Sequence, residues 1–212
     1  MKKKIIIGLF YIVGLTFLSF GISTMILANL GAGAWDAMYV GLSNITGLSV
    51  GTWILLVGIL LILVNSLLLK KIPEFLAVIT IFIIGALIDF WLLIAFPGFS
   101  LTDMGLRILM FVGSILIIAV GITFYLQSSF ARNPMDTLMM AIQIRTGKSL
   151  AFSKTVMEVT VLIIALIIGG PIGIGTIIVT FSIGPLIQLF YSPVTKFRIV
   201  LCQDHRKRVE MS

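Results

Sequence analysis

Charged residues, cysteine and histidine are scarce in this chain of 212 residues, and each shortage narrows what the protein can be. Charged residues make up 11% of the chain, whereas in a soluble domain they make up about a quarter. Hydrophobic residues account for 59%, so the composition predicts an integral membrane protein. Because Cys202 is the sole cysteine, an intrachain disulfide is excluded, and with one histidine there is no His/Cys cluster for a metal ion.

The residue groupings of enzymes are also lacking. His205 is the sole histidine and belongs to no Ser/His/Asp or Cys cluster, and the glycine-rich segment 169–175 lacks the following Lys-Ser/Thr of a nucleotide-binding loop. We therefore expect no catalytic residue, no metal and no cofactor. The net charge of +7 does not indicate nucleic acid as a partner, because the basic residues form short clusters between apolar segments.

Long apolar segments are what the sequence does contain. A membrane-spanning helix needs about 20 mostly apolar residues. Six stretches are predicted to form such helices, at residues 5–28, 50–69, 75–96, 108–127, 154–168 and 174–190. The first stretch imitates a signal peptide, but it is too long for one and predicts a span instead. Ser192 and Pro193 are expected to end the last helix.

The distribution of Lys and Arg predicts the orientation. With six spans and a cytoplasmic N-terminus, fourteen of the fifteen basic residues lie on the cytoplasmic side, and only Arg107 lies outside. A five-span alternative would place the basic C-terminal residues outside. We therefore expect a protein of the cell membrane with both termini cytoplasmic.

An internal repeat divides the chain. Residues 30–47 return as residues 130–147, with Asp36 matched by Asp136 and with a Thr-Gly pair in both copies. Two repeats of three spans, 1–98 and 99–192, followed by a basic cytoplasmic tail, 193–212, are the predicted units. Because each repeat crosses the membrane an odd number of times, the second must be inverted relative to the first.

A short helix is predicted inside each repeat, at 35–46 and 135–146. Asn133 and Pro134 are typical of a helix start, and Gly47 and Gly147 of a helix end. Both helices are too short to span, so they either lie in the interface as amphipathic helices or dip inward as re-entrant ones. The predicted fold is thus an all-α membrane protein of six transmembrane helices in two inverted three-helix repeats, each with one such short helix.

Four acidic residues are candidates for a substrate-binding site. Asp36 and Asp136 open the two short helices, where they either stabilise the helix start or shape a polar site between the repeats. Asp89 lies within the third predicted span and is either a titratable site group or a carboxylate tied to a neighbouring helix. Glu158 enters the fifth predicted span one turn after Lys154, so an ion pair with that lysine explains it equally well. Helix-start amides favour an anion and carboxylates favour a cation, so the sign of the ligand stays open.

These motifs resemble a known family. LGAGAWDAMYVGLSNITGLSVGTW (30–53), ARNPMD (131–136), RTG (145–147) and GGPIGIGT (169–176) are similar in order and spacing to the bacterial YczE/YyaS/YitT membrane proteins, especially the YczE and YyaS branch. The resemblance implies a multi-pass protein of the bacterial cytoplasmic membrane and supplies no substrate or catalytic residue. Where relatives tend to have GxGP before the second Asp, this chain has ARNP, which argues against equal ligand binding by both halves.

Two functions remain open from the sequence. The first is a small secondary transporter of a small solute or ion, and because the chain is short, a homodimer is expected to help enclose the pathway. The second is a membrane accessory protein that transports nothing and supports another membrane or biosynthetic assembly through a protein partner. Both place the chain in the lipid bilayer, and the sequence identifies neither the small-molecule ligand nor the coupling ion.

Overall fold

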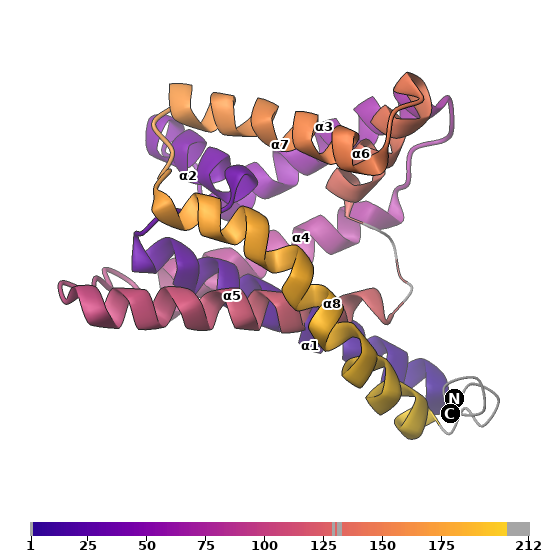
Figure 1. The fold of residues 1–212 in the computed structure, drawn as a ribbon, viewed down its shortest axis with the longest axis horizontal. Coiled ribbons are helices and arrows are strands. Elements are labelled where there is room, and N and C mark those ends of the chain that lie inside the picture. The colour runs from indigo at the N-terminus through magenta and orange to yellow at the C-terminus, as the bar shows by residue number, and fades with distance from the viewer. Residues whose placement is uncertain (1, 129, 131–132, 203–212) are drawn as a thin grey trace.

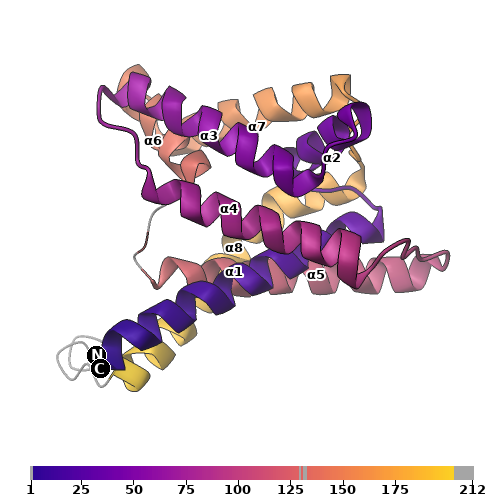
Figure 2. The same ribbon diagram turned by 180° about the vertical axis from the view of Figure 1, so that it is seen from behind.

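The protein consists of helices joined by loops, with no strand, within residues 2–128, 130 and 133–202, the part of the chain that this computed structural model describes. The elements are α1 (Lys2–Ala28), α2 (Ala34–Thr46), α3 (Val50–Leu69), α4 (Leu76–Asp89), the π-helical η1 (Phe90–Ala95), α5 (Met104–Leu126), α6 (Pro134–Thr146), α7 (Leu150–Ile167) and α8 (Ile174–Cys202). They form one bundle, in which α5 runs along the longest axis and α8 crosses it obliquely (Figures 1 and 2). The all-α prediction is confirmed.

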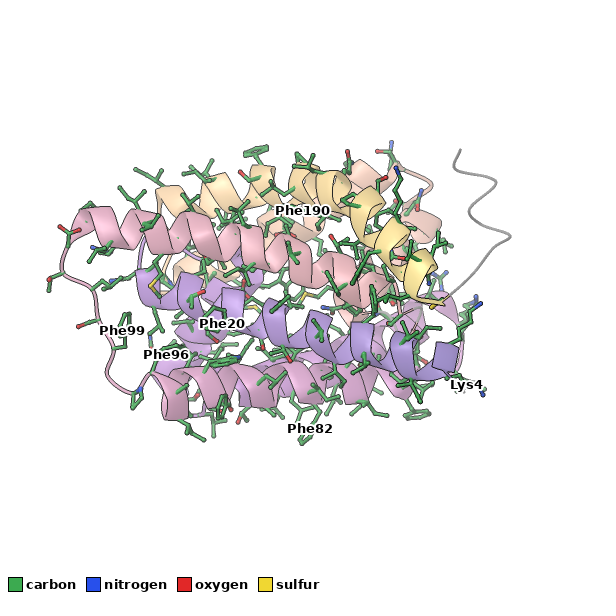
Figure 3. The ribbon with its side chains drawn as sticks, turned by 90° about the horizontal axis from the view of Figure 1, so that it is seen from below. Lys4, Phe20, Phe82, Phe96, Phe99 and Phe190 are labelled. Atoms are coloured by element: carbon green, nitrogen blue, oxygen red, sulfur yellow. The ribbon has the colours of Figure 1, made fainter. Side chains whose placement is uncertain are left out.

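Five of these helices are long and apolar enough to cross a membrane, counting only the described residues. They are α1, α3, α4 continued by η1, α5 and α8. The predicted fifth span corresponds to α7, which is not among the five. It has 18 residues, about 27 Å at 1.5 Å per residue, and it carries Lys154 and Glu158. Many large apolar side chains of the bundle point outward, as Phe82 does with 59% of its surface exposed (Figure 3).

The two halves contain the same helix-turn-helix. α2 and α6 have 13 residues each and end at left-handed glycines, Gly47 at φ 76° and Gly147 at φ 67°. Two residues later the side chain of Ser49 accepts a hydrogen bond from Thr52 N, and that of Ser149 accepts one from Phe152 N. The repeated Thr-Gly-x-Ser sequence thus ends one helix and caps the next in both places.

The most extensive helix–helix contact among the described residues is between α1 and α5. Repeat-related glycines bring these helices together. A Cβ atom on Gly21 would lie 2.6 Å from Ile118 Cγ1, and one on Gly121 would lie 2.5 Å from the Leu18 nitrogen. Small residues are the usual means of close helix packing in membranes.

The short helices pack across the two halves. α2 lies against α7 and α6 lies against α3, while α4 packs on α1 as α8 packs on α5. α2 and α6 lie toward opposite ends of the long axis, and the described parts of the N- and C-terminal helices approach each other at the α6 end (Figures 1 and 2).

The prediction that Ser192 and Pro193 end the last helix is wrong, because α8 continues through Pro193 to Cys202. Contacts with α5 hold this extension: Gln127 Nε2 donates to Thr195 Oγ1 at 2.5 Å, and Arg198 donates to the Gln127 carbonyl at 2.9 Å. Val194 and Ile199 are buried against the bundle. Tertiary packing therefore outweighs the loss of the proline hydrogen bond. The predicted tail thus begins as helix, and its residues 203–212 lie outside the described part.

Candidate functional site

A cavity of about 380 Å³ lies in the middle of the bundle, and each of the eight α-helices contributes to its wall. Most of the wall is apolar, as at Ile54, Ile84, Ile118 and Ile183. A cavity of this size falls within the usual range for small-molecule sites.

The cavity wall contains several repeat-related pairs. Asp36 and Asp136 both line it, as do the residues one position earlier and three positions later: Trp35 and Met135, and Tyr39 and Met139. The first turns of α2 and α6 therefore reach the same space from two directions.

The glycine-rich loop between α7 and α8 positions the first turn of α2. Ala32 N donates to the Pro171 carbonyl at 3.0 Å, and Gly175 N donates to the Leu30 carbonyl at 3.0 Å. Gly170 packs so closely that a Cβ atom there would lie 2.3 Å from the Ala37 carbonyl oxygen. Glycine is therefore required at 170, and this loop fixes where α2 begins.

Asp36 stands in that first turn and is half-buried, with the cavity on its open side. Although the helix start favours the ionised carboxylate, burial and, second, the Glu158 carboxylate raise the pKa of Asp36 to about 7. This group lies on α2, which is too short to cross the bilayer.

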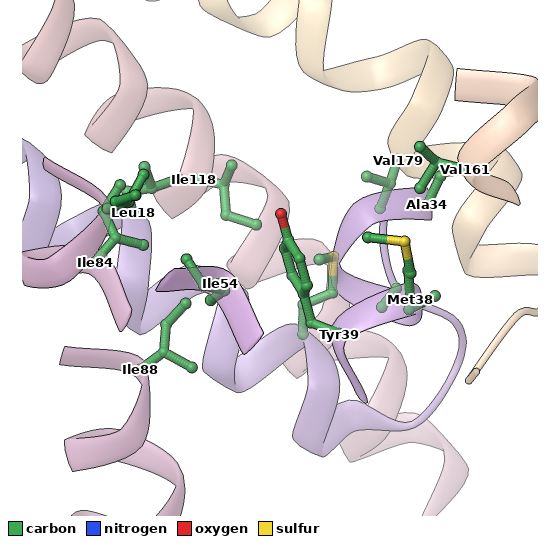
Figure 4. Close-up of a cluster of buried hydrophobic side chains, with 14 of the residues drawn as sticks. Leu18, Ala34, Met38, Tyr39, Ile54, Ile84, Ile88, Ile118, Val161 and Val179 are labelled. Atoms are coloured by element: carbon green, nitrogen blue, oxygen red, sulfur yellow. The ribbon is translucent and has the colours of Figure 1, made fainter. Parts of the chain in front are cut away.

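Two polar atoms beside Asp36 have no hydrogen-bond partner among the described residues. They are the Tyr39 hydroxyl and the Trp35 indole nitrogen, and both side chains line the cavity. Tyr39 is 1% exposed, and its ring projects from α2 among Ile54, Ile118 and Val179 (Figure 4). Leaving such buried groups unpaired costs about 1–3 kcal/mol each, so both are suited to a ligand that pairs with them.

α6 presents Asp136 from the other half. The Asn133 side chain accepts a hydrogen bond from Met135 N at 3.1 Å, and Pro134 occupies the first turn, as predicted. The Asn65 amide of α3 donates to the Pro134 carbonyl at 2.8 Å and ties the start of α6 to the first half. Asp136 is more exposed than Asp36, so the repeat-related carboxylates have different surroundings. Arg132, just before α6, lies outside the described residues.

α7 contributes the remaining charged groups. Glu158 and Lys154 both line the cavity one helical turn apart, Glu158 half-buried and Lys154 exposed. The cavity therefore brings together three of the four predicted site residues, Asp36, Asp136 and Glu158.

Asp89 lies elsewhere. Its carboxylate accepts a hydrogen bond from the Ser49 hydroxyl at 2.6 Å and another from Gly51 N at 2.8 Å. It thus holds the start of α3 from the neighbouring α4, and it is not part of the cavity wall. Of the two alternatives that the sequence left open for Asp89, this contact corresponds to a carboxylate tied to a neighbouring helix.

Sequence reasoning did not assign Trp35, Tyr39 or Lys154 to the site. Tyr39 follows Asp36 by three positions and so shares its side of the short helix, a spacing that could have placed it in the site. Lys154 was treated only as the partner of Glu158. No group of three His, Cys, Asp or Glu residues that could hold a metal ion occurs in the described part of the chain.

A family model described as "Family of unknown function (DUF6198)" matches residues 5–192. The chain belongs to this family. It is 36% identical over 182 residues to "Uncharacterized protein YyaS" of Bacillus subtilis (strain 168), which covers 86% of this chain and 90% of the relative. It is 34% identical over 190 residues to "Uncharacterized membrane protein YczE" of the same organism, covering 89% and 87%.

A Haemophilus influenzae protein (strain ATCC 51907 / DSM 11121 / KW20 / Rd) is 25% identical over 188 residues, covering 86% of this chain and 82% of the relative. No solved structure matches the chain. The resemblance to the YczE and YyaS branch is confirmed. The printed name of YczE and the five long apolar helices together indicate a membrane protein.

Proposed function

We propose that the protein is a small carrier of the cell membrane that binds a small solute in the central cavity. The observation that carries this proposal is the convergence of Asp36, Asp136 and Glu158, from three helices, on one cavity whose wall is mostly apolar. Ionisable side chains inside a membrane bundle cost several kcal/mol and usually serve a function. Asp89 is a useful contrast, because its hydrogen bonds with the start of α3 explain the presence of a carboxylate there without a ligand.

We propose six spans in two inverted repeats, with α7 added to the five long helices as the fifth span in chain order and with both termini in the cytoplasm. Three features support the inversion. The order of helices is the same in both halves, and each short helix packs on a helix of the other half, α2 on α7 and α6 on α3. The two short helices also lie toward opposite ends of the bundle (Figure 1). Carriers built this way bind substrate between the repeats and expose the site to each side in turn.

The exposed turns after α2 and α6 offer a matched test of the inversion. In a Cys202→Ser background, single cysteines replace Leu48 or Lys148, two exposed and repeat-related positions. A membrane-impermeant thiol reagent added to intact cells should label position 48, and it should label position 148 only after lysis. Labelling of both positions in intact cells would contradict the inversion.

Solute binding is tested with purified protein in lipid nanodiscs against a panel of small solutes. A true solute raises the melting temperature because it binds the native state, and its uptake into proteoliposomes then tests transport. Asp36→Asn and Glu158→Gln should each reduce the shift. Asp89→Asn should lower the starting melting temperature and leave the shift unchanged. A solute shift that survives in all three variants would remove Asp36 and Glu158 from the site.

A second function, a non-transporting accessory protein, is favoured by one observation: α8 leaves most of its surface uncovered. A protein partner or a second copy of the chain would cover it. Co-purification of one stoichiometric partner, together with no uptake of any bound solute, would favour this function over the carrier.

A further inference from the structure

The wall of the cavity is incomplete between α7 and α8. These helices diverge from the loop that joins them (Figures 1 and 2) and hardly touch within the described residues. Their counterparts α3 and α4 are in close contact, since a Cβ atom on Gly85 would lie 2.6 Å from the Gly51 carbonyl oxygen. Gly184, the repeat mate of Gly85, has no atom within 4 Å of the corresponding position.

The residues beside this opening belong to the cavity wall. Lys154 and Glu158 line the cavity from α7, and Thr180 and Ile183 line it from α8. Lys154 and Thr180 are both exposed as well as cavity-lining, as an opening between them requires. Under the proposed arrangement of spans this flank faces the acyl chains of the bilayer.

The chemistry of the wall selects a ligand class. Three carboxylic acids face one lysine, which favours a positively charged group. Trp35 and Tyr39 add aromatic faces, which attract cations. The oxygen of Tyr39, a side chain 1% exposed, has no hydrogen-bond partner among the described residues and can turn its partial negative charge toward a cationic group. The isoleucine-rich remainder suits an apolar body.

We infer that the cavity takes an amphiphilic organic cation, which enters from the bilayer between α7 and α8. This inference rests on the proposed function and names the substrate class of the same site. An inorganic ion would leave the apolar wall unused, and an anion would meet an excess of carboxylates. A lipid chain alone would pair with neither the acids nor the Tyr39 hydroxyl.

The ligand class is tested with three probes of similar size: hexyltrimethylammonium, neutral 1-heptanol and hexanesulfonate. In nanodiscs, hexyltrimethylammonium should raise the melting temperature by several degrees, and the other two should raise it by less than a third as much. Asp36→Asn and Glu158→Gln should each abolish most of the cation shift. Equal shifts from the cation and 1-heptanol would overturn the inference.

The route is tested by the reaction of a cavity cysteine with a membrane-soluble reagent. Met157 lines the cavity from α7 and is 7% exposed, so a Met157→Cys, Cys202→Ser protein is treated with N-phenylmaleimide in nanodiscs. Adding Gly184→Trp should fill the opening and slow the reaction at least tenfold. Gly113→Trp is the matched control, because Gly113 also has open space around it but lies on α5 away from the cavity. Equal rates in the two tryptophan variants would overturn the lateral route.

These outcomes separate the inference from the carrier proposal. If hexyltrimethylammonium binds but proteoliposomes do not take it up, the ligand class stands and transport is wrong. If a hydrophilic solute or an anion is bound and carried instead, transport stands and the inference is wrong.

Discussion

The helix pairs α3–α4 and α7–α8 occupy the same place in the two halves, yet one is closed and the other is open. In the first, Gly51 and Gly85 put the two backbones in contact, and Asp89 binds the start of α3. In the second, Ala151 and Gln188 stand at the positions of Gly51 and Asp89, and Gln188 is exposed. Two sequence changes between repeats thus accompany the difference between a sealed wall and a cavity with an open side.

The largest expected effect comes from removing the carboxylate that closes α3–α4. Asp89→Ala deletes the acceptor of two hydrogen bonds and should lower the free energy of unfolding by about 3 kcal/mol. Gln188→Ala is the matched change in α8 and should have little effect. Thermal unfolding in nanodiscs measures both. Equal losses would mean that the two pairs are held in the same way.

A smaller effect is expected from the glycines of the same pairs. In Gly85→Ala the new Cβ meets the Gly51 carbonyl, and such overpacking costs about 1–3 kcal/mol. Gly184→Ala meets open space and should leave stability unchanged or raise it by up to about 1 kcal/mol, because alanine favours helix. The melting temperatures of the two variants compare them directly. A large loss in Gly184→Ala would show that α8 is packed there.

The smallest effect concerns the ends of α1 and α5, where the two halves resemble each other. The Arg107 guanidinium donates to the Ala28 carbonyl at the end of α1, and that of Arg198 donates to the Gln127 carbonyl at the end of α5. Arg107→Gln and Arg198→Gln should each cost about 1 kcal/mol. Similar losses in melting temperature would mean that the two halves differ only in the pairs α3–α4 and α7–α8. A severalfold larger loss in one variant would mean that they differ at α1 and α5 as well.

Local signals in the sequence predicted most of the helices. Apolar run lengths located the long ones, and Asn133, Gly47 and Gly147 located the ends of the short ones, because capping depends on neighbouring residues. The end of α8 was missed since it depends on Gln127, which lies far away in the sequence. No local signal reports such a contact.

The same limit applies to the candidate site. An aspartate in an apolar helix looks the same in sequence whether it lines a cavity, as Asp36 does, or binds a neighbouring helix, as Asp89 does. Its partners Ser49 and Gly51 lie about forty positions earlier, and only the fold brings them together. Tyr39 was missed because its ring fits an apolar face, while its role depends on a hydroxyl left without a partner.

The most direct measurement asks whether the cavity is reached from both sides of the membrane. In a Cys202→Ser background, Met139→Cys places a thiol in the cavity wall, and Gly113→Cys provides a control on α5 away from it. A membrane-impermeant thiol reagent is applied to intact cells and, separately, to inside-out vesicles. A carrier predicts that position 139 reacts from both sides and that position 113 reacts from neither. Reaction of position 139 from one side only, under every condition, would contradict alternating access and the carrier function.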